Sequence, residues 1–120
     1  MKRFSILTLT LLLGTIVSFA QDPDFHIYIC FGQSNMEGAA RIEQCDKENV
    51  SDRFLKMAAV DDKATKQKKG RWYKAVPPLC RPNTGLTPAD YFGRTLLEAL
   101  PEKNRVGIIN VAIGGCRIEA

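Results

Sequence analysis

Ser34 stands where an apolar run, residues 25–31, gives way to the sequence FGQSNMEG, residues 31–38. The run predicts a short buried strand, and a hydroxyl at its end lies where open α/β sheets bind their ligands. Gly32 allows the backbone to bend tightly, and a helix that begins at Ser34 directs free N–H groups at a developing negative charge. This arrangement suits a nucleophilic serine. The simpler interpretation is a serine that caps a helix in a Gly-rich turn.

A second Gly-rich segment follows a second predicted strand. Residues 105–113 are rich in Val and Ile and predict a buried parallel strand, directly before Gly114 and Gly115. Because neighbouring parallel strands end at one edge of a sheet, the N–H groups of Ser34 and of one of these glycines could stabilise the same oxyanion. A glycine suits that role, since the substrate must approach the backbone closely. A plain tight turn is the alternative interpretation.

Both segments resemble sequence blocks of the SGNH-hydrolase superfamily. GQSNM followed by EG is similar to the first block, more narrowly to that of carbohydrate acetylesterases, which include sialate O-acetylesterases and family 6 acetylxylan esterases. NVAIGGC, residues 110–116, resembles their second block, whose glycine N–H contributes to the oxyanion hole; this favours Gly115. The resemblance implies that Gln33 and Asn35 shape the serine turn, whereas the alternative is backbone capping by their amide groups. It covers most of the chain after residue 24.

The base that such a serine needs is missing from this sequence. Ester hydrolysis requires a hydroxyl, a base that takes its proton, and donors for the oxyanion. The only histidine, His26, begins the strand whose other end carries Ser34, so roughly 20 Å separates them at ~3.3 Å per residue. His26 is therefore rejected as the base. In the family that the chain resembles, an Asp and a His near the C-terminus complete the triad, and no such pair is found here.

A helix and a long loop lie between the two predicted strands. TPAD, residues 87–90, predicts a helix start with a Thr cap, and Phe92, Leu96 and Ala99 then repeat at helical spacing. Residues 46–86 contain many helix and strand breakers, so we expect them to be irregular.

The order strand, loop, helix, strand is that of a doubly wound α/β domain. With the resemblance described above, it implies the start of a three-layer parallel-sheet fold of the SGNH or flavodoxin-like type. Two strands and one helix cannot cover both faces of a sheet. We therefore expect residues 21–120 to be the N-terminal part of a larger SGNH-type esterase domain.

Residues 1–20 have the pattern of a secretory signal peptide, with Lys2 and Arg3, an uncharged apolar run and a final Ala20. The run is shorter than the ~20 residues that a membrane span prefers, which argues against an uncleaved anchor. We expect cleavage after Ala20 and a secreted or periplasmic protein with no membrane contact thereafter. Cleavage lowers the formal net charge from +4 to +2, because Lys2 and Arg3 leave.

Four cysteines in an exported chain raise the question of disulfides. Cys45 and Cys80 lie in loop-like segments and are the preferred pair, but every pairing with Cys30 and Cys116 remains open. Zinc is not expected, because the sequence has no C-x-x-C and one histidine. A Lys-rich run, residues 63–74, is interpreted as a solvated loop rather than a nucleic-acid site, since no aromatic ladder accompanies it.

The sequence thus predicts an exported serine carboxylic ester hydrolase that removes O-acetyl groups from carbohydrate of the sialate or xylan type. Ser34 and Gly115 carry the chemistry, without metal or organic cofactor. The substrate class rests on the resemblance, because a shared fold does not identify a substrate. Trp72 could stack on a sugar, although anchoring its loop is the favoured interpretation. The alternative is a non-catalytic carbohydrate-binding or structural fragment, which the missing base suggests; thiol chemistry by Cys116 or Cys30 lacks a basic partner.

Overall fold

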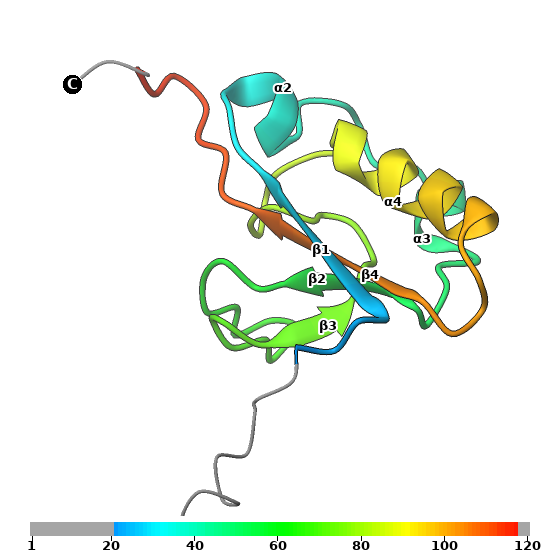
Figure 1. The fold of residues 1–120 in the computed structure, drawn as a ribbon. Coiled ribbons are helices and arrows are strands. Elements are labelled where there is room, and N and C mark those ends of the chain that lie inside the picture. Colours follow the sequence, from blue (N-terminus) through cyan, green and yellow to red (C-terminus); the bar gives the residue numbers. More distant parts are fainter. Residues whose placement is uncertain (1–20, 118–120) are drawn as a thin grey trace, which may run out of the picture.

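The computed structural model describes residues 21–117, which form one mixed sheet with its longest helix on one face (Figure 1). The expected signal peptide, residues 1–20, lies outside the described residues. Within the described part of the chain, no helix has both the length and the apolar content needed to cross a membrane.

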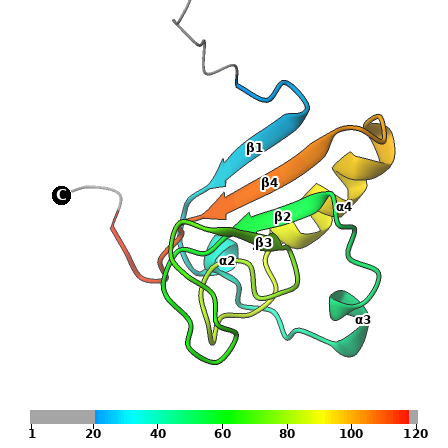
Figure 2. The same ribbon diagram turned by 90° about the horizontal axis from the view of Figure 1, so that it is seen from below.

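Four strands make up the sheet, in the spatial order β1-β4-β2-β3. They are β1 (Phe25–Cys30), β4 (Arg105–Asn110), β2 (Phe54–Met57) and β3 (Trp72–Lys74). β1 and β2 both run parallel to β4, which lies between them, and β3 runs antiparallel to β2 at the edge (Figure 2). The expected α/β class is confirmed, together with the parallel pairing of the first and last strands. The antiparallel edge strand is an addition that the sequence does not predict.

Two of these strands occupy a segment that we expected to be irregular, residues 46–86. β2 and β3 are only four and three residues long. Lys56 in the middle of β2 is only 7% exposed. A buried lysine breaks the apolar pattern that normally indicates a strand, so these elements carry little sequence signal.

The second predicted strand is shorter than expected, because β4 ends at Asn110. The chain beyond it still follows β1: the Val111 N–H donates to the Cys30 carbonyl at 2.9 Å, and the Ile113 N–H to the Gly32 carbonyl at 3.2 Å. The side chains of Val111 and Ile113 are about half exposed. The strand therefore ends three residues before the apolar pattern does, and the residues that follow it are partly exposed to solvent.

Helix α4 (Pro88–Ala99) begins as predicted. The Ala89 N–H donates to Thr87 Oγ1 at 2.9 Å, and the Thr87 N–H donates to Asp90 Oδ2 at 2.9 Å. This reciprocal pair is a capping box, which satisfies N–H groups that a helix start otherwise leaves free.

The face that α4 turns to the sheet differs from the prediction. Leu97 and Gly93 are buried, whereas Ala99 is exposed. A Cβ at position 93 would overlap the ring of Phe54 on β2. The helix can lie this close to the sheet because Gly93 has no side chain, and periodicity of large apolar residues does not reveal such a contact.

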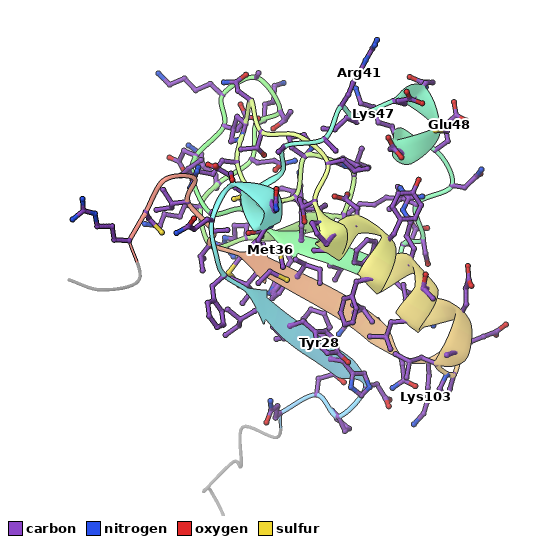
Figure 3. All side chains as sticks on the ribbon, turned by 90° about the horizontal axis from the view of Figure 1, so that it is seen from above. Tyr28, Met36, Arg41, Lys47, Glu48 and Lys103 are labelled. Atoms are coloured by element: carbon purple, nitrogen blue, oxygen red, sulfur yellow. The ribbon has the colours of Figure 1, made fainter. Side chains whose placement is uncertain are left out.

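The core lies between α4 and one face of the sheet, and its largest fully buried apolar side chains are Phe54, Leu79, Val106 and Ile108. Tyr28 extends from β1 toward α4 (Figure 3), where its ring meets that of Phe92 edge to face at 5.1 Å.

The opposite face of the sheet is only partly covered within the described residues, where the rings of Phe25 and Trp72 lie over Gly107. On β1, Ile27 is 46% exposed and Ile29 is 64% exposed. This agrees with the expectation that one helix cannot cover both faces.

The preferred disulfide between Cys45 and Cys80 is not formed, and all four cysteines have free thiols. Cys80 is buried, and its thiol donates to the carbonyl of Ala112 at 3.4 Å. Cys45 is exposed on the short helix α3 (Gln44–Lys47). The two cysteines therefore have different surroundings that do not bring their sulfurs together.

Residues 63–71 of the Lys-rich run form a mostly exposed loop with a bridge between Asp62 and Gln67, and the last three residues of the run form β3. Lys74 forms an ion pair with Asp52 at 2.8 Å. Exposed pairs of this kind contribute little to stability, and the arrangement fits a solvated loop.

Candidate active site

Two loops meet at the carboxyl ends of β1 and β4. Ser34 begins the short helix α2 (Ser34–Glu37), four residues after β1 ends, and Gly114 lies four residues after β4 ends. A Cβ built on Gly114 would lie 3.7 Å from the Cα of Ser34. The structure thus brings together the two segments that the sequence selected.

Ser34 is exposed at the start of α2, with a backbone that bends at Gly32, where φ is +146°. The helix is a single turn, closed by the Gly38 N–H donating to the Ser34 carbonyl at 3.0 Å. A helix this short has only a small dipole, so the expected dipole contribution is minor. Its individual N–H groups matter more, and among residues 21–117 the Ser34 N–H has no acceptor.

The two glycines of the second loop have different partners. The Gly114 N–H donates to Glu37 Oε2 at 2.8 Å. The Gly115 N–H has no acceptor within the described residues, and φ at Gly115 is +74°. Gly115 therefore retains a donor for an added group, whereas the donor of Gly114 is already used.

The two amide side chains beside Ser34 have separate surroundings. Gln33 Nε2 donates to the Cys116 carbonyl at 2.8 Å and so ties the serine turn to the second loop. Asn35 is exposed and lies in a shallow groove with Leu86 and Tyr91. Gln33 thus links the serine turn to the second loop, whereas Asn35 is exposed to solvent.

Asn110, at the last position of β4, was not selected from the sequence. Its side chain is completely buried, with Nδ2 donating to the Met36 carbonyl at 2.7 Å and Oδ1 accepting from the Ala112 N–H at 3.1 Å. Met36 on α2 lies over this end of the sheet (Figure 3). Asn110 therefore holds the serine helix and the second loop to the end of one strand. A polar residue at the end of an apolar strand was the available signal.

Arg81, in the loop before α4, is a second residue that sequence reasoning missed. It forms an ion pair with Glu37, and its Nη1 donates to the Ala112 carbonyl at 3.1 Å. Arg81 and Glu37 are 44 residues apart. Nothing in a single sequence indicates that such distant residues pair.

Two other candidate groups lie elsewhere on the sheet. His26, near the amino end of β1, has its Nε2 3.0 Å from Asn104 Nδ2. Trp72 packs edge to face on Phe25, the first residue of β1, with 4.9 Å between ring centroids. His26 is therefore remote from Ser34, and the ring of Trp72 anchors β3 against the sheet.

The described residues contain no group of three or more His, Cys, Asp or Glu side chains placed to hold a metal ion. The chemistry that the site can offer is a hydroxyl with backbone donors. Burial raises the pKa of the Cys30 thiol, which disfavours the thiolate that thiol chemistry would need.

These features define an α/β protein with a candidate hydrolase site at the carboxyl edge of its sheet. A family model described as carbohydrate esterase, sialic acid-specific acetylesterase, matches residues 24–120. The chain therefore belongs to this family of carbohydrate esterases, which confirms the resemblance drawn from the two sequence blocks.

Proposed function

We propose that Ser34 is the nucleophile of an esterase that removes O-acetyl groups from carbohydrate. The observation that carries the proposal is the approach of the Gly114–Gly115 turn to Ser34, where a Cβ on Gly114 would lie 3.7 Å from the Ser34 Cα. The N–H groups of Ser34 and Gly115 both have no acceptor among the described residues. Membership of the carbohydrate esterase family supports the same chemistry.

In the proposed reaction, the Ser34 hydroxyl attacks the acetyl carbonyl and its proton passes to a base. The N–H groups of Ser34 and Gly115 stabilise the oxyanion of the tetrahedral intermediate. The C–O bond to the sugar then breaks, the sugar oxygen takes a proton and leaves, and acetyl-serine remains. Water attacks this ester in the same manner, which releases acetate and restores the hydroxyl.

The base is the part of the proposal that these 120 residues do not supply. A hydrogen bond to Ser34 needs about 3 Å between heavy atoms, and the one histidine lies at the amino end of β1. We propose that an Asp-His pair from outside these residues completes the triad, as in the enzymes that the chain resembles. On this proposal, residues 21–120 alone hydrolyse no ester.

The first test is acetate release from acetylated sialic acid and acetylated xylan by the intact protein and its Ser34→Ala variant. Loss of the nucleophile should lower turnover on the order of 10⁴-fold. Ser51→Ala, which changes an exposed serine in a loop, is the matched control. A fluorophosphonate should label Ser34 alone, as seen by peptide mass spectrometry. Hydrolysis that persists in Ser34→Ala would refute the assignment.

Gly115 allows a second test with its own control. Gly115→Pro removes the N–H and should cost at least about 10²-fold in turnover. Gly115→Ala retains the N–H, and its methyl group would meet no atom of residues 21–117 within 4 Å. It should therefore be much less harmful, apart from strain at its positive φ. Equal losses in the two variants would show that the N–H has no role.

The missing base favours one other candidate function, a carbohydrate-binding or structural protein without catalysis. Such a protein would bind acetylated sugar without releasing acetate, and Ser34→Ala would not change that binding. Calorimetric titration with an acetylated oligosaccharide beside the acetate assay separates the two functions.

We also propose that the protein is exported and that its mature form begins at Gln21. The basic start and apolar run of residues 1–20 support this. Mass spectrometry of protein recovered outside the cytoplasm should find Gln21 at the N-terminus. An exported form that begins at Met1 would contradict cleavage.

A further inference from the structure

A carboxylate lies unusually close to the donors proposed for the oxyanion. Glu37 is on the same helical turn as Ser34, and its Oε2 accepts from the Gly114 N–H at 2.8 Å. Gly115 is the next residue. A negative charge in this position repels an oxyanion, so a nearby positive charge is needed to offset the repulsion.

Arg81 provides the compensating charge. Its Nη2 pairs with Glu37 Oε1, while its Nη1 donates to the Ala112 carbonyl at 3.1 Å. The two side chains are 27% and 21% exposed, so solvent screens the pair only partly. The guanidinium thus binds both the serine helix and the chain that leads into the second loop.

Further hydrogen bonds hold the loop that carries Arg81 in place. Thr84 Oγ1 donates to the Arg81 carbonyl at 2.8 Å. Further along, the Gly85 N–H donates to the Gly38 carbonyl at 2.7 Å, directly after α2. Three segments that are distant in the sequence therefore meet at the Glu37–Arg81 pair.

The close approach of the Glu37 carboxylate also restricts which residue can occupy position 114. A Cβ there would lie 2.5 Å from Glu37 Oε2. The carboxylate in its present position therefore leaves no room for a side chain at Gly114. This contact holds the Ile113–Gly114 peptide, which directly precedes the peptide that carries the Gly115 N–H, and so restricts the positions that this N–H can take.

We propose that Glu37 and Arg81 are positioning residues for the esterase reaction: Glu37 orients the Gly115 donor through Gly114, and Arg81 neutralises Glu37 beside the oxyanion. This proposal rests on the proposed function of Ser34 and Gly115. Glu37 acts through its oxygen acceptor and Arg81 through its charge, so their variants should behave differently.

The test compares kcat and KM for acetate release by the intact protein and the variants Glu37→Gln, Arg81→Gln and the double variant. Glu37→Gln retains an oxygen that accepts from Gly114, so kcat should fall by about 10-fold or less. Arg81→Gln leaves an unpaired carboxylate beside the oxyanion and should lower kcat on the order of 10²-fold. The double variant removes both charges and should recover most of that loss. KM should change little throughout.

Arg81→Lys keeps the charge and serves as the conservative rescue, with kcat between those of the wild type and Arg81→Gln. Arg105→Gln is the matched control, because Arg105 pairs with Asp22 at 2.6 Å near the amino end of β1. It should leave kcat unchanged. Losses that add in the double variant, or an Arg81→Gln variant no worse than Glu37→Gln, would overturn the proposal.

A measurement that needs no activity accompanies these assays. Amide hydrogen exchange at Gly114 should stay slow in Glu37→Gln and become at least about 10-fold faster in Glu37→Ala, which has no acceptor. Unchanged exchange in Glu37→Ala would also overturn the positioning role. A wild-type protein that releases no acetate would instead refute the proposed function, while active wild type with the wrong order of variants refutes the positioning role alone.

Discussion

Replacement of Asn110 by Asp tests how the site is held together. Asn110 is completely buried at the end of β4, donates to the Met36 carbonyl at 2.7 Å and accepts from the Ala112 N–H at 3.1 Å. Asn110→Asp keeps the shape and the acceptor. At neutral pH it replaces the donor with a second oxygen that faces the Met36 carbonyl.

The expected loss follows from the two groups affected. A buried carbonyl without its donor costs about 1–3 kcal/mol, and an unpaired buried carboxylate adds a further penalty. We expect the free energy of unfolding to fall by at least about 3 kcal/mol at pH 8, a large share of the 5–15 kcal/mol typical of a domain.

The loss should depend on pH in a defined direction. Burial favours the protonated carboxyl, which can donate to the Met36 carbonyl, so the folded state raises the pKa of the introduced group. The variant is then nearest to the wild type below the unfolded pKa, near 4, and loses stability as pH rises through the folded value.

Urea unfolding of the intact wild-type and variant proteins at pH 5 and pH 8 measures both effects, with acetate release as a second readout. Asn49→Asp makes the same exchange at an exposed position and should change little. A loss below about 1 kcal/mol at pH 8, or an equal loss at both pH values, would refute the argument that Asn110 acts as a buried donor.

Three further variants test the fold by urea unfolding. Arg53 donates to three carbonyls at the end of α4 and beyond it. Arg53→Met should therefore lower the free energy of unfolding by about 1–3 kcal/mol. An unchanged free energy of unfolding would show that these contacts do not contribute to stability. Gly93→Ala should lose about 1–3 kcal/mol, despite the better helix propensity of Ala, because the methyl group meets the Phe54 ring; a gain in stability would contradict this packing. Burial raises the pKa of Asp90 to about 6, so the folded state binds its proton more tightly and stability falls as pH rises from about 4 through 6. Asp90→Asn should flatten that part of the pH profile, and an unchanged profile would assign the dependence to another group.

The sequence was most informative where local rules decide the structure. β1 follows from its apolar run, and α4 follows from the TPAD start, because capping depends on neighbouring residues only. The meeting of Ser34 with the second Gly-rich loop was also predictable. It depends on parallel strands that end at one edge, and β1 pairs directly with β4.

Other features depend on contacts between distant residues and left little local signal. β2 contains the buried Lys56, whose Nζ donates to the carbonyls of Val76 and Pro78 at 3.0 and 2.6 Å. Those acceptors come from a loop about 20 residues away, so the lysine looks like a surface residue in the sequence. Arg81 was missed for the same reason, because its partner Glu37 is 44 residues away.

The outer edge of β1 has a consequence for handling the protein. Within the described residues β1 pairs only with β4, so its other edge presents unpaired N–H and C=O groups. The exposed side chains of Ile29 and Phe31 lie along and just beyond that strand. An open strand edge with apolar side chains is a template for pairing with another chain. We therefore expect residues 21–120, produced alone, to self-associate through β1. A substitution that places a charge on this strand, such as Ile29→Lys, should reduce the self-association.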